Sequence, residues 1–389
     1  MIYLDYTANA LVEPEVLNTF CEVERRCLGN ANARHSAGRQ AHAEMEKAIQ
    51  RTAEILNVEP GELIFSSGAS ESNNTAIFGI AHASRHIGRH IITTPLEHAS
   101  VSACLTSLQE RGWEIDVLEV DRQGMIDLEH LKSLLRADTV LVTVCAVDSE
   151  LGTIQPIDAV KAILTEKPDC RLHVDATQII GKLPFRLQTA DTVSLSGHKI
   201  GGINGSGLLW KRNEVGMEPL IHGGTSTTLY RSGSPAVALA ASLAKALEIA
   251  CSNQEQRLNR VHLLNALLRR RLSTMENVMI HSPGNALPHI LNLGVKGIRG
   301  VDFRDALDAK GICVSVKSAC SVENTPSRAV YAVTRNRRQA LEAWRVSLSH
   351  LTTTEEIEAF ISACNEIVGG FKEYSRMGST IIMRKPLDR

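Results

Sequence analysis

The feature that most constrains the fold is an alternation of apolar strands and helical segments between about residue 60 and residue 210. The run Thr139–Val144 is apolar on both faces, which is typical of a central strand in a parallel sheet covered by helices. Similar short runs start at residues 62, 90, 114, 172 and 192. This order predicts a doubly wound α/β sheet, in which ligands bind at the carboxyl ends of the strands.

The chain of 389 residues is too long for one small core and predicts a large domain with a smaller companion. We assign residues 14–250 to the large domain. Residues 1–13 and 251–389 are expected to form a smaller α/β domain. A helical pattern from about residue 236 to residue 272, broken near Asn253, is expected to bridge the two.

Two local predictions concern the large domain. A strand at residues 62–65 leads through a turn of small residues into a helix that we expect to begin near Asn74. The glycines of residues 201–207 lack the Gly-Lys-Ser/Thr ending of a nucleotide-binding phosphate loop. We therefore expect a tight hairpin there, just before Leu208.

The charge balance does not favour nucleic acid or an acidic membrane surface as a partner. Lysine and arginine number 42 against 43 aspartates and glutamates, which gives a net charge of −1. The sequence contains no apolar run of membrane-spanning length and no N-terminal targeting pattern, so we expect a cytoplasmic protein. The nine cysteines show no CxxC pairing, so neither a disulfide framework nor a metal site is indicated.

Two neighbouring strand ends carry an aspartate and a lysine. One predicted strand ends at Asp175, and the strand Thr192–Leu195 is followed by a small polar turn containing Lys199. This pair suits pyridoxal 5′-phosphate (PLP), whose aldehyde forms a Schiff base with a lysine and whose ring nitrogen is kept protonated by a carboxylate. The alternative is an ordinary surface turn around Lys199.

Two further segments would surround such a cofactor. The small residues from Ser66 to Asn74 place N–H groups and hydroxyls at the start of a helix, which is a natural seat for a phosphate. The alternative is a simple helix cap by Ser70. The ring of His98 could stack on a flat cofactor, although a lone histidine at a helix start is more often a cap or a surface residue.

Taken in order, these segments resemble the cysteine desulfurases, the NifS/IscS-like group of class V PLP enzymes with fold type I. The resemblance covers nearly the whole chain. It implies a large domain with a mostly parallel, seven-stranded type of sheet and a smaller α/β C-terminal domain. The segments that carry it are residues 67–74, 97–98, 173–178, 196–199, 231–234, 318–321 and 345–348.

The resemblance also implies a role for each residue of the cofactor site. Lys199 would be the Schiff-base lysine and would move the α-proton, and Asp175 would pair with the pyridinium nitrogen. Gln178 would hydrogen-bond the phenolic oxygen, and His98 would stack on the ring and act in acid–base chemistry. The cofactor-binding positions so implied are Ala69, Ser70, His98, Ser149, Asp175, Gln178, Ser196, His198, Lys199 and Ser234.

Three residues further along the chain complete the site that the resemblance implies. Arg345 would bind the substrate α-carboxylate with its planar fork, together with Ser149. Cys320 would attack the sulfur of the substrate L-cysteine and become a persulfide, leaving alanine. The alternative for Cys320 is a loop cysteine with no role. Ser234 lies in a loop that reaches the neighbouring subunit in this family, which implies a homodimer.

The sequence departs from the family pattern near the expected site. Asp148-Ser149 stands where two asparagines are usual, and the second of these normally contacts cofactor and substrate. Lys317 replaces a glycine three residues before Cys320, where a cation would favour the thiolate. His350 stands where the pattern has an arginine.

The expected function is that of a cysteine desulfurase, which passes sulfane sulfur from Cys320 to an acceptor protein for iron–sulfur clusters, thio-cofactors or tRNA. A divergent class V enzyme is the first alternative: a selenocysteine or cysteine-sulfinate lyase, or another lyase or transaminase. A binding or scaffold protein that keeps the fold is the second alternative. It predicts that no Schiff base forms.

Overall fold

A seven-stranded sheet organises the larger part of the molecule, in the order β2-β8-β7-β6-β5-β3-β4. The computed structural model describes residues 1–224, 226–317 and 325–376. Every neighbouring pair of strands is parallel except the two made by β8, which runs antiparallel to β2 and β7. The strands are β2 (Leu63–Ser66), β3 (His90–Thr93), β4 (Glu114–Val117), β5 (Thr139–Cys145), β6 (Arg171–Asp175), β7 (Thr192–Ser196) and β8 (Gly207–Lys211).

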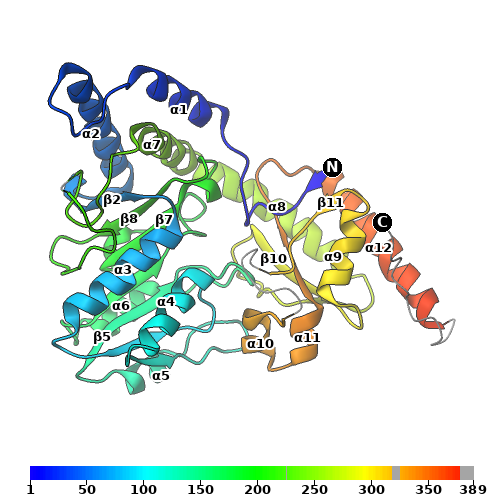
Figure 1. Ribbon diagram of the computed structural model, residues 1–389. Coiled ribbons are helices and arrows are strands. Elements are labelled where there is room, and N and C mark those ends of the chain that lie inside the picture. The colour runs from blue at the N-terminus through cyan, green and yellow to red at the C-terminus, as the bar shows by residue number, and fades with distance from the viewer. Residues whose placement is uncertain (225, 318–324, 377–389) are drawn as a thin grey trace, which may run out of the picture.

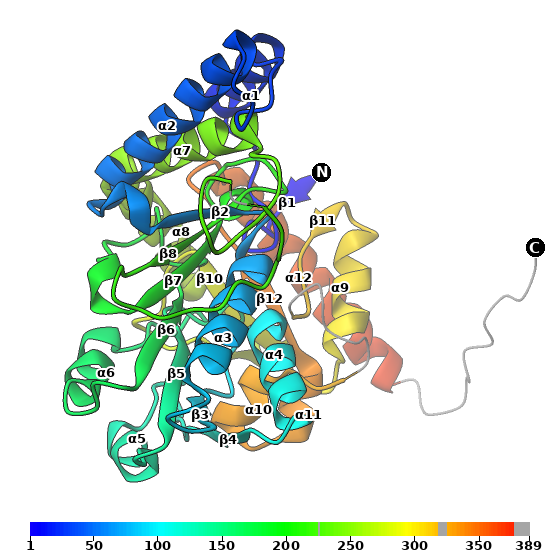
Figure 2. The same ribbon diagram turned by 60° about the vertical axis from the view of Figure 1, so that its left-hand side comes forward.

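Helices cover both faces of this sheet, which confirms the predicted α/β fold with a mostly parallel sheet. In Figure 2, α3 and α4 lie on one side of the strands and α6 lies on the other. At the upper end, α7 packs against α1 and α2. The helices of this part are α1 (Pro14–Arg26), α2 (Ser36–Leu56), α3 (Ala69–Ser84), α4 (Ala99–Gln109), α5 (Leu128–Leu134), α6 (Ile157–Leu164) and α7 (Val237–Ser252), with short 3-10 helices η1 (Pro60–Glu62), η2 (Leu187–Thr189) and η3 (Gly197–Lys199).

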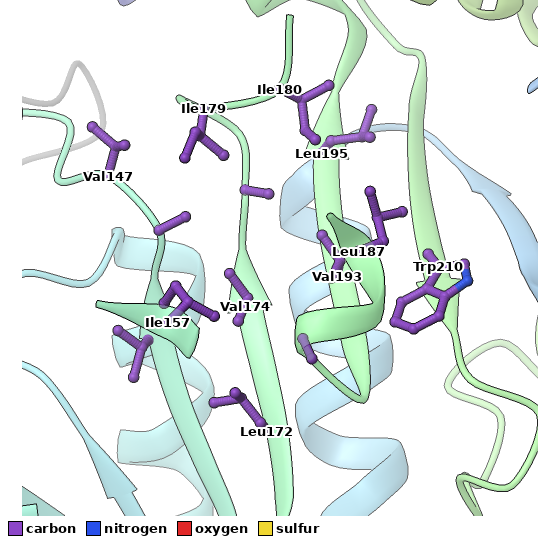
Figure 3. Close-up of a cluster of buried hydrophobic side chains, with 14 of the residues drawn as sticks. Val147, Ile157, Leu172, Val174, Ile179, Ile180, Leu187, Val193, Leu195 and Trp210 are labelled. Carbon is purple, nitrogen blue, oxygen red and sulfur yellow. The ribbon is translucent and has the colours of Figure 1, made fainter. Parts of the chain in front are cut away.

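The main core lies between the strands and the helices that cover them. Leu172 and Val174 of β6, Val193 and Leu195 of β7, and Trp210 of β8 all belong to one cluster of buried side chains (Figure 3). Each is at most 2% exposed. Burying one such aliphatic side chain is worth about 1.5–3 kcal/mol relative to leaving it exposed. The cluster therefore fixes the strand ends that carry the site.

The smaller part has its own sheets and its own core, on the right of Figure 1. Phe303 and Trp344 stack with ring centroids 4.8 Å apart at the centre of this core. An antiparallel sheet has the order β12-β10-β9, and β1 pairs in parallel with β11. The elements are β1 (Ile2–Tyr3), α8 (Gln254–Leu272), β9 (Val278–Ile280), β10 (Ile290–Val295), α9 (Gly300–Asp308), β11 (Ile312–Cys313), α10 (Arg328–Thr334), α11 (Arg337–Glu342), β12 (Ala343–Ser347) and α12 (Thr354–Arg376).

The predicted break in the long helix is confirmed, because α7 ends at Ser252 and α8 begins at Gln254. The two helices run from the larger part of the molecule into the smaller one (Figure 1). The residue ranges proposed for the two domains stay a prediction. Among the described helices, none is both long enough and apolar enough to cross a bilayer.

Two local predictions were wrong. The helix expected to begin near Asn74 begins at Ala69, because Gly68, with φ at +152°, turns the chain directly from β2 into α3. The connection before β8 is not a tight hairpin, since β7 ends at Ser196 and β8 begins at Gly207. That longer connection contains η3, which ends at Lys199.

Candidate active site

A cavity of about 260 Å³ lies where the last residues of β5, β6 and β7 meet. Parallel strands bring their carboxyl ends to one edge of a sheet, so this is the edge at which the sequence predicted ligand binding. Nine of the predicted site residues line the cavity, from five separate stretches of the chain. They are Ala69, Ser70, His98, Ser149, Asp175, Gln178, Ser196, His198 and Lys199, and Arg345 of β12 joins them from the smaller part of the molecule.

The carboxylate of Asp175 is held at the end of β6 by a donor on each oxygen. Oδ2 accepts from Nδ2 of Asn73 at 2.9 Å, and Oδ1 accepts from the backbone N–H of Thr177 at 3.0 Å. The side chain is 6% exposed. These two donors fix the orientation of the carboxyl group, which is the group that would pair with the ring nitrogen of a cofactor.

Asn73 is a buried hub that the sequence interpretation missed. Its Nδ2 also donates to Ser100 Oγ at 2.9 Å. Because its amide N–H₂ faces Asp175, its oxygen must accept, and it does so from Nε2 of His173 at 3.0 Å and from the hydroxyl of Ser194. Burial lowers the pKa of His173 to about 4, so that ring is neutral and keeps a single N–H for this contact.

A signal for Asn73 was present in the sequence. On helix α3 it precedes Ile77 by four residues and Ile80 by seven, and both isoleucines are fully buried. A polar residue at that spacing falls on the buried face of an amphipathic helix and needs partners there. The identity of those partners depends on packing against β6 and β7, which no local pattern reveals.

His98 caps helix α4 and presents its ring to the same cavity. Its Nδ1 accepts from the backbone N–H of Ser100 at 3.1 Å, so the neutral ring carries its proton on Nε2. Burial lowers the pKa of His98, and the neighbouring cations Lys199 and Arg328 lower it further. The neutral form of the ring is the one suited to stacking and to accepting a proton.

Lys199 ends η3, and its Nζ donates to the carbonyl oxygen of Ala8 at 2.5 Å. This contact draws the N-terminal segment across the cavity, where Thr7 and Ala8 form part of the wall. The neighbouring His198 has its pKa lowered to about 4, first by burial and then by the charges of Lys199 and Lys182. His198 is therefore a neutral hydrogen-bonding group at neutral pH.

The start of helix α3 has the features of an anion seat. The N-cap residue Gly68 has no side chain to cap the helix, and the backbone N–H of Ala69 donates to Ser196 Oγ at 2.7 Å. A Cβ on Gly207 would lie 2.4 Å from Cα of Gly68, so the close approach of β8 to this turn requires glycine. The helix dipole, the backbone N–H groups of the first turn and the hydroxyls of Ser70 and Ser196 together suit a phosphate.

A sequence profile described as aminotransferase class-V matches residues 2–360. A NifS/IcsS protein homolog of Lactobacillus delbrueckii subsp. bulgaricus is 34% identical over 97% of this chain and 100% of that protein. Cysteine desulfurase IscS of Azotobacter vinelandii is 34% identical over 96% of this chain and 94% of its own length. A solved NifS-like protein is 34% identical and superposes with a TM-score of 0.89 over 95% of this chain and 99% of its own.

The chain belongs to the class V aminotransferase family, within its cysteine desulfurase group. PLP is the cofactor of this family, and the cavity fits it. A carboxylate, an amine and the start of a helix lie around one space. These are the groups needed for a ring nitrogen, an aldehyde and a phosphate.

Arg345 of β12 is 2% exposed and is already held by two partners. Its Nη2 pairs with Asp5 Oδ1 at 2.8 Å, and its Nη1 donates to the carbonyl oxygen of Ser149 at 2.8 Å. Its Nε is buried and has no hydrogen bond within the part of the chain that the structure describes. The contact joins residues 340 positions apart, so no local sequence pattern indicates it.

Two acids next to residues that line the cavity are buried, Asp148 and Glu97. Burial raises the pKa of Asp148 to about 7, and the charge of Glu150 contributes in the same direction. Burial also raises the pKa of Glu97 to about 8. Asp148 does not point a free carboxylate at the cavity: its Oδ2 accepts from the backbone N–H groups of Glu150, at 3.1 Å, and of Leu151.

Ser234, a predicted site residue, does not line the cavity. Ser234 is exposed and accepts from Nδ2 of Asn30 at 3.1 Å, away from the cavity lining. Cys320 lies outside the described residues. Lys317, the last described residue before it, donates from Nζ to the carbonyl oxygen of Thr325 at 2.8 Å and to its hydroxyl. The predicted effect of Lys317 on the Cys320 thiolate stays a prediction.

Proposed function

We propose that this protein converts L-cysteine to L-alanine and carries the released sulfur on Cys320 as a persulfide. The observation that carries the proposal is the meeting of Lys199, Asp175 and Arg345 around one cavity in a chain of the cysteine desulfurase group. These three residues supply an amine, a carboxylate partner for a ring nitrogen and a cation for an amino-acid carboxylate.

When bound, PLP supplies an aldehyde that links to amines and a pyridinium ring that withdraws electrons from the bonds at the substrate α-carbon. Asp175 would keep the ring nitrogen protonated, and the neutral ring of His98 would stack on the cofactor. Gln178 would donate to the phenolic oxygen. Ala69, Ser70, Ser196 and His198 line the cavity and would hold the phosphate, with Ser149 as a further cofactor contact.

Arg345 binds the substrate carboxylate, and Lys199 takes the α-proton on its Nζ. The contacts of Arg345 with Asp5 and with the carbonyl of Ser149 orient the guanidinium before substrate arrives. Lys199 is also held at the cavity wall, by its hydrogen bond to the carbonyl oxygen of Ala8. The residues that act on the substrate therefore come from both parts of the molecule.

The sulfur step uses the thiolate of Cys320, which attacks the sulfur of the substrate. A sulfur–sulfur bond forms and the carbon–sulfur bond of the substrate breaks. The electron pair of the broken bond stays with the substrate carbon skeleton, which takes up a proton there and leaves as alanine. The balance is L-cysteine and a Cys320 thiol in, L-alanine and a Cys320 persulfide out.

The proposal includes two partners. A sulfur-acceptor protein receives the sulfane sulfur, because a persulfide is a carrier that a further thiol must discharge. A second copy of the chain completes the phosphate site with Ser234. The exposed position of Ser234, outside the cavity of its own chain, supports this homodimer. Size measurement in solution tests it, and a monomer with full activity would contradict it.

The test of the function measures alanine and sulfide released from L-cysteine in the presence of PLP and a thiol reductant. The wild type should release the two products in equal amounts. Cys320→Ala should lose both while it retains the visible absorbance of the bound cofactor. Cys313→Ala is the matched control, since Cys313 is a partly buried thiol on β11 in the same part of the chain. Undiminished sulfide release by Cys320→Ala would contradict the proposed nucleophile.

A second candidate is a lyase or transaminase of the same family that acts on another amino acid, such as selenocysteine or cysteine sulfinate. Asp148 and Ser149, which replace two asparagines of the usual pattern, favour it. Turnover of a panel of amino acids decides between the two. Turnover of a different amino acid, with none of L-cysteine, would replace the first proposal.

A further inference from the structure

The turn after β6 brings a second lysine close to the cofactor site. Gly181 in this turn has φ at +71°, and a Cβ there would lie 2.7 Å from Cβ of Ala250 on α7. The turn is thus packed tightly against α7. It places Gln178 and Lys182 beside each other, four residues apart.

Lys182 donates from Nζ to Oε1 of Gln178 at 2.7 Å, and this is the only hydrogen bond that its side chain makes among the described residues. The other end of the Gln178 amide faces the cavity: Nε2 makes a long contact of 3.3 Å with the carbonyl oxygen of Thr7. Lys182 itself lines a separate cavity of about 60 Å³, which also touches Lys199. Lys182 therefore lies behind Gln178 as seen from the cofactor site.

The charged groups that influence Lys182 are cations, so an ion pair does not explain its position. Burial lowers the pKa of Lys182 to about 7, and the charges of Lys199 and Arg345 act in the same direction. The charge of Lys182 in turn lowers the pKa values of His198 and His289. A lysine that lies among like charges and donates to a neutral glutamine oxygen does not serve to neutralise an acid.

An amide has two distinguishable ends, and a donor placed against one end selects the oxygen for that side. As an ammonium, the Nζ of Lys182 has only donors, so its partner must be the amide oxygen of Gln178. With the oxygen held on the far side, the amide N–H₂ is directed into the cavity. The contact with Thr7 agrees with this orientation but is too long to impose it alone.

We propose that Lys182 is a positioning residue: it holds the amide oxygen of Gln178 so that the amide N–H₂ donates to the phenolic oxygen of the cofactor. This inference rests on the proposed function and deepens it. A donor on the phenolic oxygen lowers the basicity of the oxygen and of the Lys199 nitrogen next to it in the bound cofactor. Loss of that donor therefore raises the pH at which the visible band of the cofactor titrates.

The experiment is a pH titration of the visible absorbance of the PLP-loaded protein. Lys182→Met keeps the length of the side chain and removes the donor. The midpoint of the absorbance titration should therefore rise by about one pH unit, which is the effect of one charge-assisted hydrogen bond. Lys211→Met is the matched control, because Lys211 is 2% exposed and also donates only to neutral oxygens, three backbone carbonyls outside the cavity. Its midpoint should stay at the wild-type value.

A double-mutant cycle separates positioning from a direct effect of charge. Gln178→Leu should shift the midpoint as Lys182→Met does, and the double variant should shift it no further. An unchanged midpoint in Lys182→Met overturns the proposal, and so does a Lys182→Met shift that persists in full in the Gln178→Leu background. If Lys182→Met does not fold, Lys182→Arg replaces it in the test. Arginine keeps a donor, so this variant should have the wild-type midpoint. A shift as large as that of Gln178→Leu overturns the proposal. A wild type without a visible band after addition of PLP refutes the proposed function instead.

Discussion

Replacement of Asp148 by asparagine should stabilise the protein, and the gain should grow with pH. Asp148 is 1% exposed, and its pKa is raised from an ordinary 3.8 to about 7, mainly by burial and then by the charge of Glu150. Its Oδ2 accepts two backbone N–H groups, at Glu150 and Leu151. An asparagine oxygen can accept the same two hydrogen bonds, so Asp148→Asn removes the ionisation and keeps the turn.

The sign follows from the raised pKa. Below about pH 4 the carboxyl group of Asp148 is protonated in both the folded and the unfolded chain, so it costs no stability. As the pH rises toward about 7, the unfolded chain loses the proton while the folded chain keeps it, and stability is lost. A shift of about three units corresponds to about 4 kcal/mol once the pH exceeds 7, and to about 1.5 kcal/mol at pH 5.

Asparagine does not titrate, so the stability difference between Asp148→Asn and wild type should increase by about 3 kcal/mol from pH 5 to pH 8. The assay is chemical denaturation of the PLP-loaded protein at several pH values, at one protein concentration and one ionic strength. Asp158→Asn is the control, because Asp158 has a side chain 80% exposed and should give a small difference at every pH. A constant difference between Asp148→Asn and wild type would refute the reasoning that Asp148 is protonated in the folded protein.

Two other substitutions test the frame around the cavity. Asp5→Asn leaves the guanidinium of Arg345 buried without its anion. We therefore expect denaturation to show a loss of about 3 kcal/mol in the free energy of unfolding. Steady-state kinetics should show a raised KM for L-cysteine. Gly207→Ala places a methyl group 2.4 Å from Cα of Gly68, so it should displace the start of α3. A cofactor titration should show PLP binding weakened at least about tenfold. Unchanged affinity would contradict the proposal that the phosphate binds at the start of α3.

The central sheet and its strand ends could be predicted from the sequence because they depend on local patterns. The doubly apolar run at Thr139–Val144 became the buried strand β5, and the runs that start at residues 90 and 192 became β3 and β7. Asp175 and Lys199 were expected at neighbouring strand ends, and β6 and β7 are indeed paired. Strand ends of one parallel sheet meet by geometry, so residues placed there are brought together whatever the loops do.

The residues that hold this site in place could not be predicted in the same way. Asn73 meets Asp175 across 102 positions, and Asp5 meets Arg345 across 340. Such pairs depend on how a helix packs on a sheet and on how the N-terminal segment crosses between the two parts of the molecule. Local polarity marks these residues only as turn or helix positions, and no spacing rule connects them.

These support contacts also bear on how substrate binds. A buried guanidinium without a partner is costly, yet one fully occupied by protein carboxylates would have little to offer a substrate. Arg345 lies between these limits, since Asp5 neutralises it, the Ser149 carbonyl takes one further N–H, and Nε has no described partner. The side chain has therefore already lost its rotamer freedom before the substrate carboxylate arrives. Binding then costs less conformational entropy, which is the advantage of a preorganised site.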